Sequence, residues 1–393
     1  MQKKEMAEEI LKKYNQEQIL EYLNSLENKE MDDFVEQILQ IDFAEIFALY
    51  ENTKKDKKEM SNEEITPIDY IDKEKINSKD MSKYIQIGEE IIKNNQYAVV
   101  TMAGGQGTRL GFSGPKGSYK LSNGKYIFEI LSENIKKAKD RYGIFPYWYI
   151  MTSVQNNDQT VEFFKEHDFF GIDKEKVKFF EQGTLPMLTP EGKMIIEDGK
   201  IKTASNGNGG VYSSLKREKI LEDMKKNNIK WVYISGVDNI MVNPIDPLLV
   251  ELTIDNNMPI ASKSVAKKYP EEKVGVFCKR DGKPSIVEYI ELSENMRIEC
   301  DNFGELVYGE ANIVSHLLNL ETIEKISTQK VDYHLEIKKG LYKFEAFVFD
   351  GFKFADDMLV MRVKREDEFA PIKNKEGVDS PETAVEIYEK KRI

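Results

Sequence analysis

The sequence predicts an α/β protein built around a mixed, mostly parallel sheet and preceded by a helical region. Two observations predict this class. From Tyr97 onward, short apolar runs alternate with stretches whose apolar residues recur at helical spacing. Strands that alternate with helices form largely parallel sheets through right-handed crossovers. Before Tyr97, apolar residues recur at helical intervals only.

Residues 1–95 are expected to be helical throughout. Ile19, Leu23 and Leu26 show the helical spacing. The stretch from Asn52 to Asn62 is rich in charged and amide residues, which indicates a linker or solvated loop. A further helix is predicted from about Met81 to Lys93.

The first strand of the main domain is predicted at Tyr97–Met102, a short apolar run that ends in glycines. A helix with apolar residues from Ile127 to Ile135 follows and stops near Gly143, and another lies around Val161 and Phe164. Further strands are predicted at Tyr147–Met151, Val177–Phe180, Trp231–Ile234 and Ile260–Val265. This order predicts a Rossmann-like sheet, which binds ligands at the carboxyl ends of its strands.

Two later segments depart from this alternation. The runs 273–278 and 285–289, joined through Arg280-Asp281-Gly282-Lys283, predict a β-hairpin, so the sheet should be mixed. The apolar run Ile313–Leu318, which contains His316, is expected on a helix. The predicted division is therefore a helical region at 1–95, a main domain at 96–375 and a short tail or helix at 376–393.

Composition excludes several classes of protein. The 393 residues carry a formal net charge of −12, which disfavours a general nucleic-acid binder. The three histidines and two cysteines do not have zinc-ligand spacing. The N-terminus has no apolar leader, and no apolar run approaches the roughly 20 residues of a membrane span. We expect a cytoplasmic protein with reduced thiols, no membrane partner and a monomeric or weakly homo-oligomeric state.

A glycine-rich loop follows the first strand. Residues 101–119 read TMAGGQGTRLGFSGPKGSY, so four glycines, Arg109 and Lys116 fall on one loop. Glycines let backbone N–H groups approach a ligand closely, and the two cations suit a polyphosphate. The loop matches neither the dinucleotide-binding fingerprint nor the Walker A pattern. It is therefore a candidate phosphate site of another type.

The motif GGQGTRLGFSGPKG resembles the signature loop of the UDP-sugar pyrophosphorylases, most closely the UDP-N-acetylhexosamine branch. The resemblance extends from about residue 65 to the last 20 residues. Further motifs recur in the family's order: EQGTLP at 181–186, NGNGGVY at 206–212, SGVDN at 235–239, EKVGVF at 272–277, VEY at 287–289, AN at 311–312, KFEAFVFD at 343–350 and REDEFAPIKN at 365–374. The resemblance implies a nucleotidyltransferase fold, glycosyltransferase-A-like, with 96–375 as its catalytic domain.

The resemblance also implies the site residues. Arg109, Lys116 and Lys373 would be catalytic, and Asp238 would hold Mg²⁺, with Mn²⁺ possible. UTP would be bound by Met102, Ala103, Gly104, Gly105, Lys116, Gln182, Gly207, Asp238 and Lys343. The sugar would be bound by Asn208, Glu288, Tyr289, Asn312 and Lys373.

The implied reaction joins UTP and a sugar 1-phosphate, N-acetylglucosamine or N-acetylgalactosamine 1-phosphate, by direct in-line displacement of pyrophosphate. A phosphate monoester is already a nucleophile near neutral pH, so the protein must supply alignment and charge neutralisation rather than a general base. Two alternatives stay open at this point. The chain could be a UDP-glucose or broad-specificity pyrophosphorylase, or a nucleotide-sugar-binding protein without catalysis.

Overall fold

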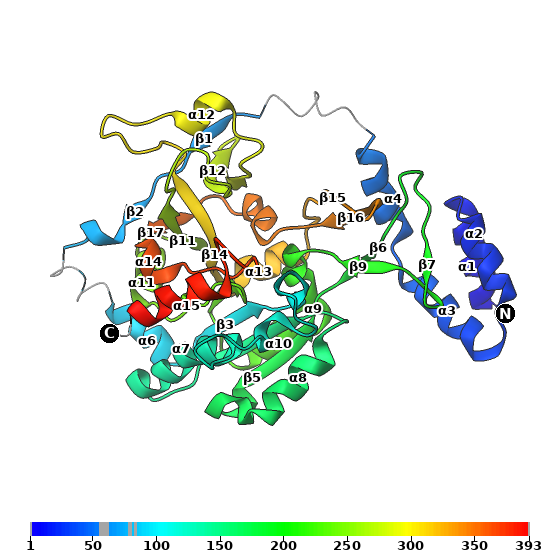
Figure 1. The fold of residues 1–393 in the computed structure, drawn as a ribbon, viewed down its shortest axis with the longest axis horizontal. Helices are drawn as coiled ribbons and strands as arrows, with labels where there is room; N and C mark the ends of the chain where they lie inside the picture. Colours follow the sequence, from blue (N-terminus) through cyan, green and yellow to red (C-terminus); the bar gives the residue numbers. More distant parts are fainter. Residues whose placement is uncertain (1, 55–62, 78–80, 82–84, 392–393) are drawn as a thin grey trace. The chain divides into compact units, whose positions relative to one another are not determined.

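The computed structural model describes residues 2–391 except 55–62, 78–80 and 82–84. Most of the predicted linker at 52–62 lies outside the described residues, as does part of the helix predicted from Met81, whose regular portion is α6 (Gln86–Lys93). Packing divides the chain into two compact units, whose strands and helices are labelled in Figure 1. A large unit contains residues 63–182, 211–330 and 348–393, and a small unit contains residues 1–62, 183–210 and 331–347. The described residues between 63 and 95 thus belong to the large unit, whereas the predicted division placed them with the N-terminal helices.

The main sheet belongs to the large unit. Its longest path runs β2 (Ile71–Asp72), β17 (Leu359–Arg362), β11 (Ile260–Ala266), β14 (Glu310–Asn319), β10 (Trp231–Gly236), β3 (Tyr97–Met102), β4 (Tyr147–Thr152) and β5 (Val177–Glu181). Neighbouring strands along this path pair in parallel, except that β14 runs antiparallel to both β10 and β11. The predicted strands of the α/β core are therefore confirmed.

The helical prediction for residues 313–318 is wrong, because these residues lie inside strand β14. His316 faces Ile234 of β10 on one side and Ser262 of β11 on the other. A central strand that is buried on both faces reads as a continuous apolar run, and such a run cannot be told from a buried helix by periodicity alone.

The hairpin is confirmed as the antiparallel pair β12 (Val276–Arg280) and β13 (Lys283–Val287). Strand β1 (Ile65–Pro67) pairs with β12, and β2 pairs with β17. The helical prediction for residues 1–95 is therefore wrong at 65–72. The isoleucines and the threonine of this stretch favour a strand, but its pairing with strands that are distant in the sequence could not be recognised from the local pattern.

Helices surround the sheet of the large unit (Figure 1), and short 3₁₀ turns lie in the connections between its strands and helices. Besides α6, the helices are α7 (Ile127–Tyr142), α8 (Asn157–Glu166), α9 (Val211–Arg217), α10 (Ile220–Lys226), α11 (Pro247–Asp255), α12 (Glu294–Ile298), α13 (Leu320–Ser327), α14 (Arg365–Glu368) and α15 (Pro381–Lys390). The 3₁₀ turns are η2 (Lys73–Lys75), η3 (Gly107–Leu110), η4 (Lys116–Ser118), η5 (Asp168–Gly171), η6 (Lys174–Lys176) and η8 (Val348–Phe354). Gly143 ends α7 in a left-handed conformation, as predicted.

The small unit has its own apolar core, formed by residues such as Leu11, Ile38, Ile46 and Phe344. Its helices are α1 (Gln2–Lys13), α2 (Glu17–Ser25), α3 (Asn28–Gln40) and α4 (Phe43–Asn52), with the 3₁₀ turn η7 (Asn208–Gly210). Its strands form three two-stranded pairs: β6 (Thr184–Pro186) with β9 (Thr203–Ser205), β7 (Ile196–Glu197) with β8 (Lys200–Ile201), and β15 (His334–Lys338) with β16 (Leu341–Glu345). Across the described part of the chain, no helix is both long enough and apolar enough to cross a membrane.

Candidate active site

The glycine loop begins where β3 ends in the middle of the sheet. Ala103 N–H donates to the carbonyl of Met151 (2.7 Å), which extends the β3–β4 contact by one residue. The loop then folds back on itself, because Lys116 N–H donates to the carbonyl of Gly105 (3.1 Å). The amide nitrogen of Asn156 donates to the carbonyls of Ala103 (3.0 Å) and Gly105 (3.3 Å). These contacts fix the backbone of the loop against the carboxyl edge of the sheet.

The glycines of this loop serve different purposes. A Cβ on Gly104 would lie 2.0 Å from Oε1 of Gln182, and one on Gly117 would lie 2.2 Å from the ring of Phe128. A Cβ on Gly105 would meet no protein atom within 4 Å, and Gly105 does not have a positive φ. Within 104–117, Gly105 is alone in having no such internal reason to be glycine. An open space beside its backbone fits the approach of a ligand.

Asp238 lies at the same edge, two residues after β10. Val237 N–H donates to the carbonyl of Met102 (3.1 Å), which joins the ends of β10 and β3. A Cβ on Gly236 would lie 2.5 Å from Oδ1 of Asp238, so the carboxylate folds back over a position that has no side chain. The structure thus places Asp238 beside the start of the glycine loop.

Three cations gather with this carboxylate. Burial lowers the pKa of the Lys116 ammonium, the carboxylate of Asp238 opposes this effect, and the charges of Lys373 and Arg109 add to it. Lys116 is half-buried, whereas Arg109 and Lys373 are exposed. Four side chains predicted from three motifs therefore come together, with Lys116 close enough to interact electrostatically with each of the other three.

Lys373 reaches this cluster through a backbone contact. Ile372 N–H donates to the carbonyl of Asp238 (2.8 Å), so the residue before Lys373 is tied to the candidate metal ligand. The ammonium of Lys373 lies 5.9 Å from the centre of the Phe369 ring and 3.9 Å from a carboxylate oxygen of Asp379. These are weak contacts, so the lysine can turn toward a phosphate.

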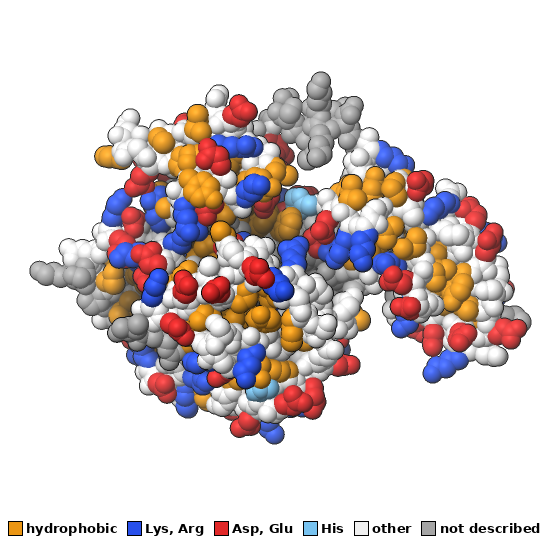
Figure 2. Space-filling model, in the orientation of Figure 1, with side chains coloured by type: hydrophobic (Ala, Val, Ile, Leu, Met, Phe, Trp, Pro, Cys, Tyr) orange, Lys and Arg blue, Asp and Glu red, His pale blue; other side chains and the backbone are white. Residues whose placement is uncertain are grey.

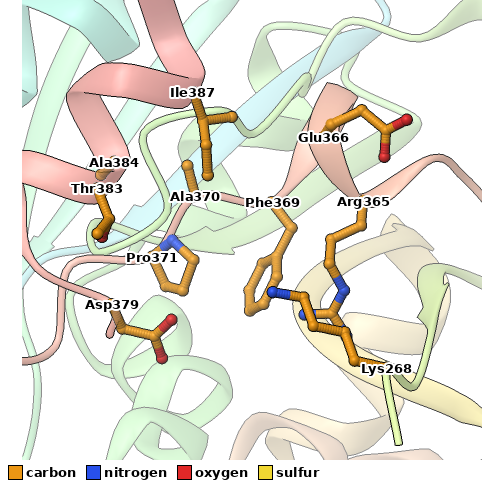
Figure 3. Close-up of a pocket in the computed structure, with 10 residues that line it drawn as sticks. All are labelled: Lys268, Arg365, Glu366, Phe369, Ala370, Pro371, Asp379, Thr383, Ala384 and Ile387. Carbon is orange, nitrogen blue, oxygen red and sulfur yellow. The ribbon is translucent and has the colours of Figure 1, made fainter. Parts of the chain in front are cut away.

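A pocket of about 240 Å³ borders the segment that leads to Lys373 (Figure 3). Phe369, Ala370 and Pro371 form one side of it, and Ile387 of α15 lies across from them. Lys268 and Arg365 extend toward the ring of Phe369. None of the residues predicted for the site lines this pocket.

Glu288 and Asn312 come together around Gly275. A Cβ on Gly275 would lie 3.1 Å from Oε1 of Glu288, and Asn312 N–H donates to the carbonyl of Gly275 (2.9 Å). Glu288 follows β13 directly, while Asn312 lies near the start of β14 and pairs with Ser264 of β11. Tyr289 is next along the chain, with the ammonium of Lys273 6.0 Å from its ring centre.

Three predicted residues belong to the small unit. Gly207 has a φ of +86°, and a Cβ there would lie 2.2 Å from the carbonyl oxygen of Ala346, so this glycine is required by the fold. Asn208 opens the 3₁₀ turn η7. Lys343 forms ion pairs with Glu345 and with Glu336 (3.4 Å). Binding a phosphate through Lys343 would require it to give up part of these pairs.

The donors at Asp238 fit a hard cation rather than zinc. Among the described residues, no three His, Cys, Asp or Glu side chains form a group that could hold a metal ion by themselves. Magnesium uses one or two carboxylates and completes its octahedral shell with phosphate oxygens and water. Asp238 beside a phosphate-binding loop matches that requirement.

Sequence reasoning missed three polar residues that build the site. Asn156 holds the glycine loop, Asn239 joins the chain after Asp238 to the segment before Lys373, and Lys263 is fully buried in β11. Asn239 was visible inside SGVDN, and Lys263 is a charge within an apolar strand sequence, IASKSV. A polar residue next to a motif could have identified Asn239, and a charge within a buried strand could have identified Lys263.

A mostly parallel sheet with a phosphate-type loop and a carboxylate among cations defines a nucleotidyltransferase-like protein. The family described as UTP–glucose-1-phosphate uridylyltransferase matches residues 41–378, and the chain belongs to this family. It is 36% identical over 409 residues to UDP-N-acetylglucosamine diphosphorylase 2 of Arabidopsis thaliana, covering 96% of this chain and 81% of that protein. It is 35% identical over 344 residues to UDP-N-acetylglucosamine pyrophosphorylase of Saccharomyces cerevisiae, covering 79% and 72%.

Solved structures give the same result. The uridine diphosphate N-acetylglucosamine pyrophosphorylase of Trypanosoma brucei superposes with a TM-score of 0.84 at 29% identity, covering 98% of this chain and 84% of that one. A UDP-glucose phosphorylase of the same organism superposes with a TM-score of 0.66 at 14% identity, covering 86% and 74%, and shows a shared fold.

Proposed function

We propose that this chain transfers the uridylyl group of UTP to N-acetylglucosamine 1-phosphate and releases pyrophosphate. The observation that carries this proposal is the gathering of Asp238, Lys373 and Arg109 around Lys116, beside the open backbone of Gly105. The N-acetylglucosamine specificity is taken from the relatives' names, since those relatives cover most of this chain. N-acetylgalactosamine 1-phosphate is the second substrate to test, because the two sugars differ at one hydroxyl.

The chemistry is one displacement. An oxygen of the sugar phosphate attacks the α-phosphorus of UTP, and the bond from that phosphorus to the oxygen bridging to the β-phosphorus breaks. The electron pair leaves with pyrophosphate, so no covalent enzyme intermediate forms. The two anionic substrates repel each other, and the protein must hold them in line and neutralise charge at the α-phosphorus.

Each residue of the loop has a role in that task. The backbone of Met102, Ala103, Gly104 and Gly105 faces the nucleotide, with Gln182 held against Gly104. Arg109 and Lys116 neutralise the β- and γ-phosphates, which become the leaving group. Lys373 binds the phosphate of the sugar. Lysine is suited to these positions because it acts as a compact point charge.

Asp238 would hold Mg²⁺ or Mn²⁺ together with UTP phosphate oxygens. When bound, the ion supplies further neutralisation of the transferring phosphate. The protein's own part is to keep the carboxylate at the sheet edge next to Lys116 and Lys373.

The sugar is assigned to Glu288, Tyr289 and Asn312. A carboxylate accepts hydrogen bonds from neighbouring hydroxyl groups, and an amide can both donate and accept. Glu288 and Asn312 lie around the same glycine, Gly275, which supports a shared ligand. Gly207, Asn208 and Lys343 keep the nucleotide and sugar roles that the sequence motifs imply, as predictions about the small unit.

The cytoplasmic location also belongs to this proposal. Cys278 is buried and Cys300 is exposed, and both are free thiols. Free thiols fit a reducing compartment.

The test is pyrophosphate release from UTP and Mg²⁺ with three acceptors in parallel: N-acetylglucosamine, N-acetylgalactosamine and glucose 1-phosphates. We expect the highest kcat/KM with N-acetylglucosamine 1-phosphate and loss of release in Asp238→Asn. A preference for glucose 1-phosphate would contradict the proposed sugar substrate but would still support uridylyl transfer. No release with any acceptor, in a protein that binds UDP-sugars, would replace the proposed enzyme with a binding protein.

A further inference from the structure

We infer that Asn239 is a positioning residue that holds Asp238 and Lys373 in register, supported by the buried charges of Lys263 and Glu368. This inference rests on the proposed function, since it concerns how two substrate-binding residues are aligned. Asp238 follows β10, whereas Lys373 lies 135 residues later in the chain. Some physical link must therefore keep them together.

Asn239 provides a direct link between the two segments. Its side-chain nitrogen donates to the carbonyl of Glu368 (2.7 Å), and its side-chain oxygen accepts from Ala370 N–H (2.9 Å). The side chain is buried, with only 4% exposed. Asn239 and Pro371 also form an antiparallel bridge. The two backbone groups bridged by this amide lie on either side of Phe369, within five residues of Lys373.

Lys263 forms a second link between the same segments. Its fully buried ammonium lies 2.8 Å from Asp246 and 2.7 Å from Glu368, and it donates to the carbonyl of Asn243 (3.0 Å). Asp246 and Asn243 belong to the chain after β10, and Glu368 belongs to the segment before Lys373. A lysine surrounded in this way holds its partners together, because moving either carboxylate away would weaken a buried ion pair. Lys73 pairs with the same two carboxylates from the partly exposed side, at 3.2 and 3.8 Å.

The segment before Lys373 is buried and is held at more than one point. Phe369, Ala370 and Ile372 belong to the apolar core of the large unit, and Phe369, Ala370 and Pro371 also border the pocket of about 240 Å³ (Figure 3). The backbone bond from Ile372 N–H to the carbonyl of Asp238 would remain in any Asn239 variant. The amide of Asn239 therefore sets the register of residues 368–370 against Asp238, while the core and the backbone bond keep the segment in place.

The expected effect follows from the geometry. Without the Asn239 amide, Asp238 can still take part in UTP binding, and Lys373 can still bind the phosphate of the sugar. The KM for UTP and the KM for the sugar phosphate should therefore change little. The relative alignment of Asp238 and Lys373 would be lost, and a misplacement of about 1 Å costs roughly 10²-fold in rate. A fall in kcat at constant KM, expressed per folded molecule, is thus the signature of a positioning role. The folded fraction must be measured by thermal melts, because a smaller folded fraction would also lower the apparent kcat.

The experiment compares Asn239→Ala with Asn134→Ala. The Asn134 amide donates to the carbonyl of Val242 (2.9 Å), so its loss removes a similar hydrogen bond to the same chain after β10 without touching the 365–372 segment. We expect about 10²-fold lower kcat, nearly unchanged KM for both substrates and unchanged UTP binding by calorimetry in Asn239→Ala. Asn134→Ala should keep the wild-type kcat. An unchanged kcat in Asn239→Ala, or an equal fall in both variants, would overturn the inference.

A second variant and a second readout cover the other outcomes. Asn239→Ser leaves a neutral hydroxyl that is too short to reach both backbone groups, so it should lower kcat in the same direction if the alanine variant does not fold. Amide hydrogen exchange across 365–373 should become faster in the Asn239 variants and not in Asn134→Ala. If the wild-type chain shows no turnover, the proposed function fails, while unchanged exchange would separately overturn the positioning role.

Discussion

Gln182 lies directly against Gly104: a Cβ on that glycine would stand 2.0 Å from the side-chain oxygen of Gln182. This contact joins the glycine loop after β3 to the end of β5, where Gln182 N–H donates to the carbonyl of Thr152 (2.9 Å). Two motifs that are about 75 residues apart in the sequence therefore form one surface. The neighbouring Gly105 has no protein atom beside its Cβ position. Gly104 is therefore a glycine for packing reasons, whereas Gly105 leaves space for a ligand.

Gly105→Ala should abolish turnover without lowering stability. The added methyl group meets open space in the protein, and loss of glycine reduces the entropy of the unfolded chain, so the melting temperature should stay equal or rise slightly. The methyl group would occupy the space proposed for the nucleotide.

The matched change is Gly117→Ala, whose Cβ would lie 2.2 Å from the fully buried ring of Phe128. It should lower the free energy of unfolding by about 1–3 kcal/mol through overpacking. Thermal melts and initial rates measure both variants. Full activity in Gly105→Ala would show that the nucleotide does not bind beside Gly105.

Lys116→Ala should lower kcat by orders of magnitude and leave the fold intact. The ammonium is assigned to the leaving phosphates, and removing one such charge costs about 10²–10³-fold in rate. Lys120→Ala, an exposed lysine of the same stretch, is the control and should have normal rates. Steady-state kinetics with saturating UTP decides between them, and near-normal turnover in Lys116→Ala would refute its assignment.

UTP binding should take up protons at alkaline pH. Burial lowers the pKa of Lys116 in the ligand-free protein, so part of the population is neutral below the ordinary lysine pKa of about 10.4. Phosphate oxygens favour the charged form, so binding raises this pKa and the lysine gains a proton. Calorimetry in buffers of different ionisation enthalpy measures the uptake. The uptake should disappear in Lys116→Met, and equal uptake in both proteins would assign it to another group.

Lys263→Met should destabilise the large unit strongly. It removes the buried cation between Asp246 and Glu368, and it leaves these two buried carboxylates with the partly exposed Lys73 at 3.2 and 3.8 Å. Breaking a buried ion pair from one side costs about 3–5 kcal/mol, and Lys73 offsets part of this loss. Lys279→Met removes a partly exposed pair with Asp357 (2.9 Å) and should cost about 0–1 kcal/mol. Denaturant titration compares the two, and similar losses would contradict the assigned role of the buried cluster.

Acid should destabilise the protein through His316. Burial lowers the pKa of this histidine from about 6.5 to about 3. The unfolded chain therefore binds a proton that the folded chain does not, so stability is full above pH 6.5 and falls as the pH drops toward 3. This single group contributes a slope of about 1.4 kcal/mol per pH unit within that window.

His316→Gln cannot titrate and should show a shallower loss of stability between pH 6.5 and 5. The amide can still bond to Ser262, which lies 2.8 Å from Nδ1 of His316. Identical pH profiles for the two proteins, measured by denaturant titration, would show that His316 is not the responsible group.

The strands near the site could be predicted because their evidence is local. The apolar run at 97–102 predicts a buried strand, and the glycines directly after it predict a loop whose backbone a ligand can approach. The run around His316 was assigned to a helix because its partners, β10 and β11, are distant in sequence, and only their pairing makes it a strand. The same holds for residues 65–72, which become strands only by joining β12 and β17.

The sequence predicted which residues belong to the candidate site, but their arrangement in space is seen only in the structure. Motifs identified Arg109, Lys116, Asp238 and Lys373, yet no local pattern could bring Lys373 next to Asp238. The two segments are joined by the backbone bond from Ile372 to Asp238, by Asn239 and by the buried Lys263–Glu368 pair, which are tertiary features. Likewise, the distinction between Gly104 and Gly105 depends on Gln182, a residue on another strand end.

The central claim is uridylyl transfer to a sugar phosphate, and ³¹P NMR of one reaction tests it most directly. The purified chain is mixed with UTP, N-acetylglucosamine 1-phosphate and Mg²⁺, and all phosphorus signals are followed together. We predict that UTP and sugar phosphate signals fall in equal amounts while signals of a UDP-sugar diester and of pyrophosphate appear. Unchanged UTP, or release of inorganic phosphate with the sugar phosphate untouched, would contradict the account.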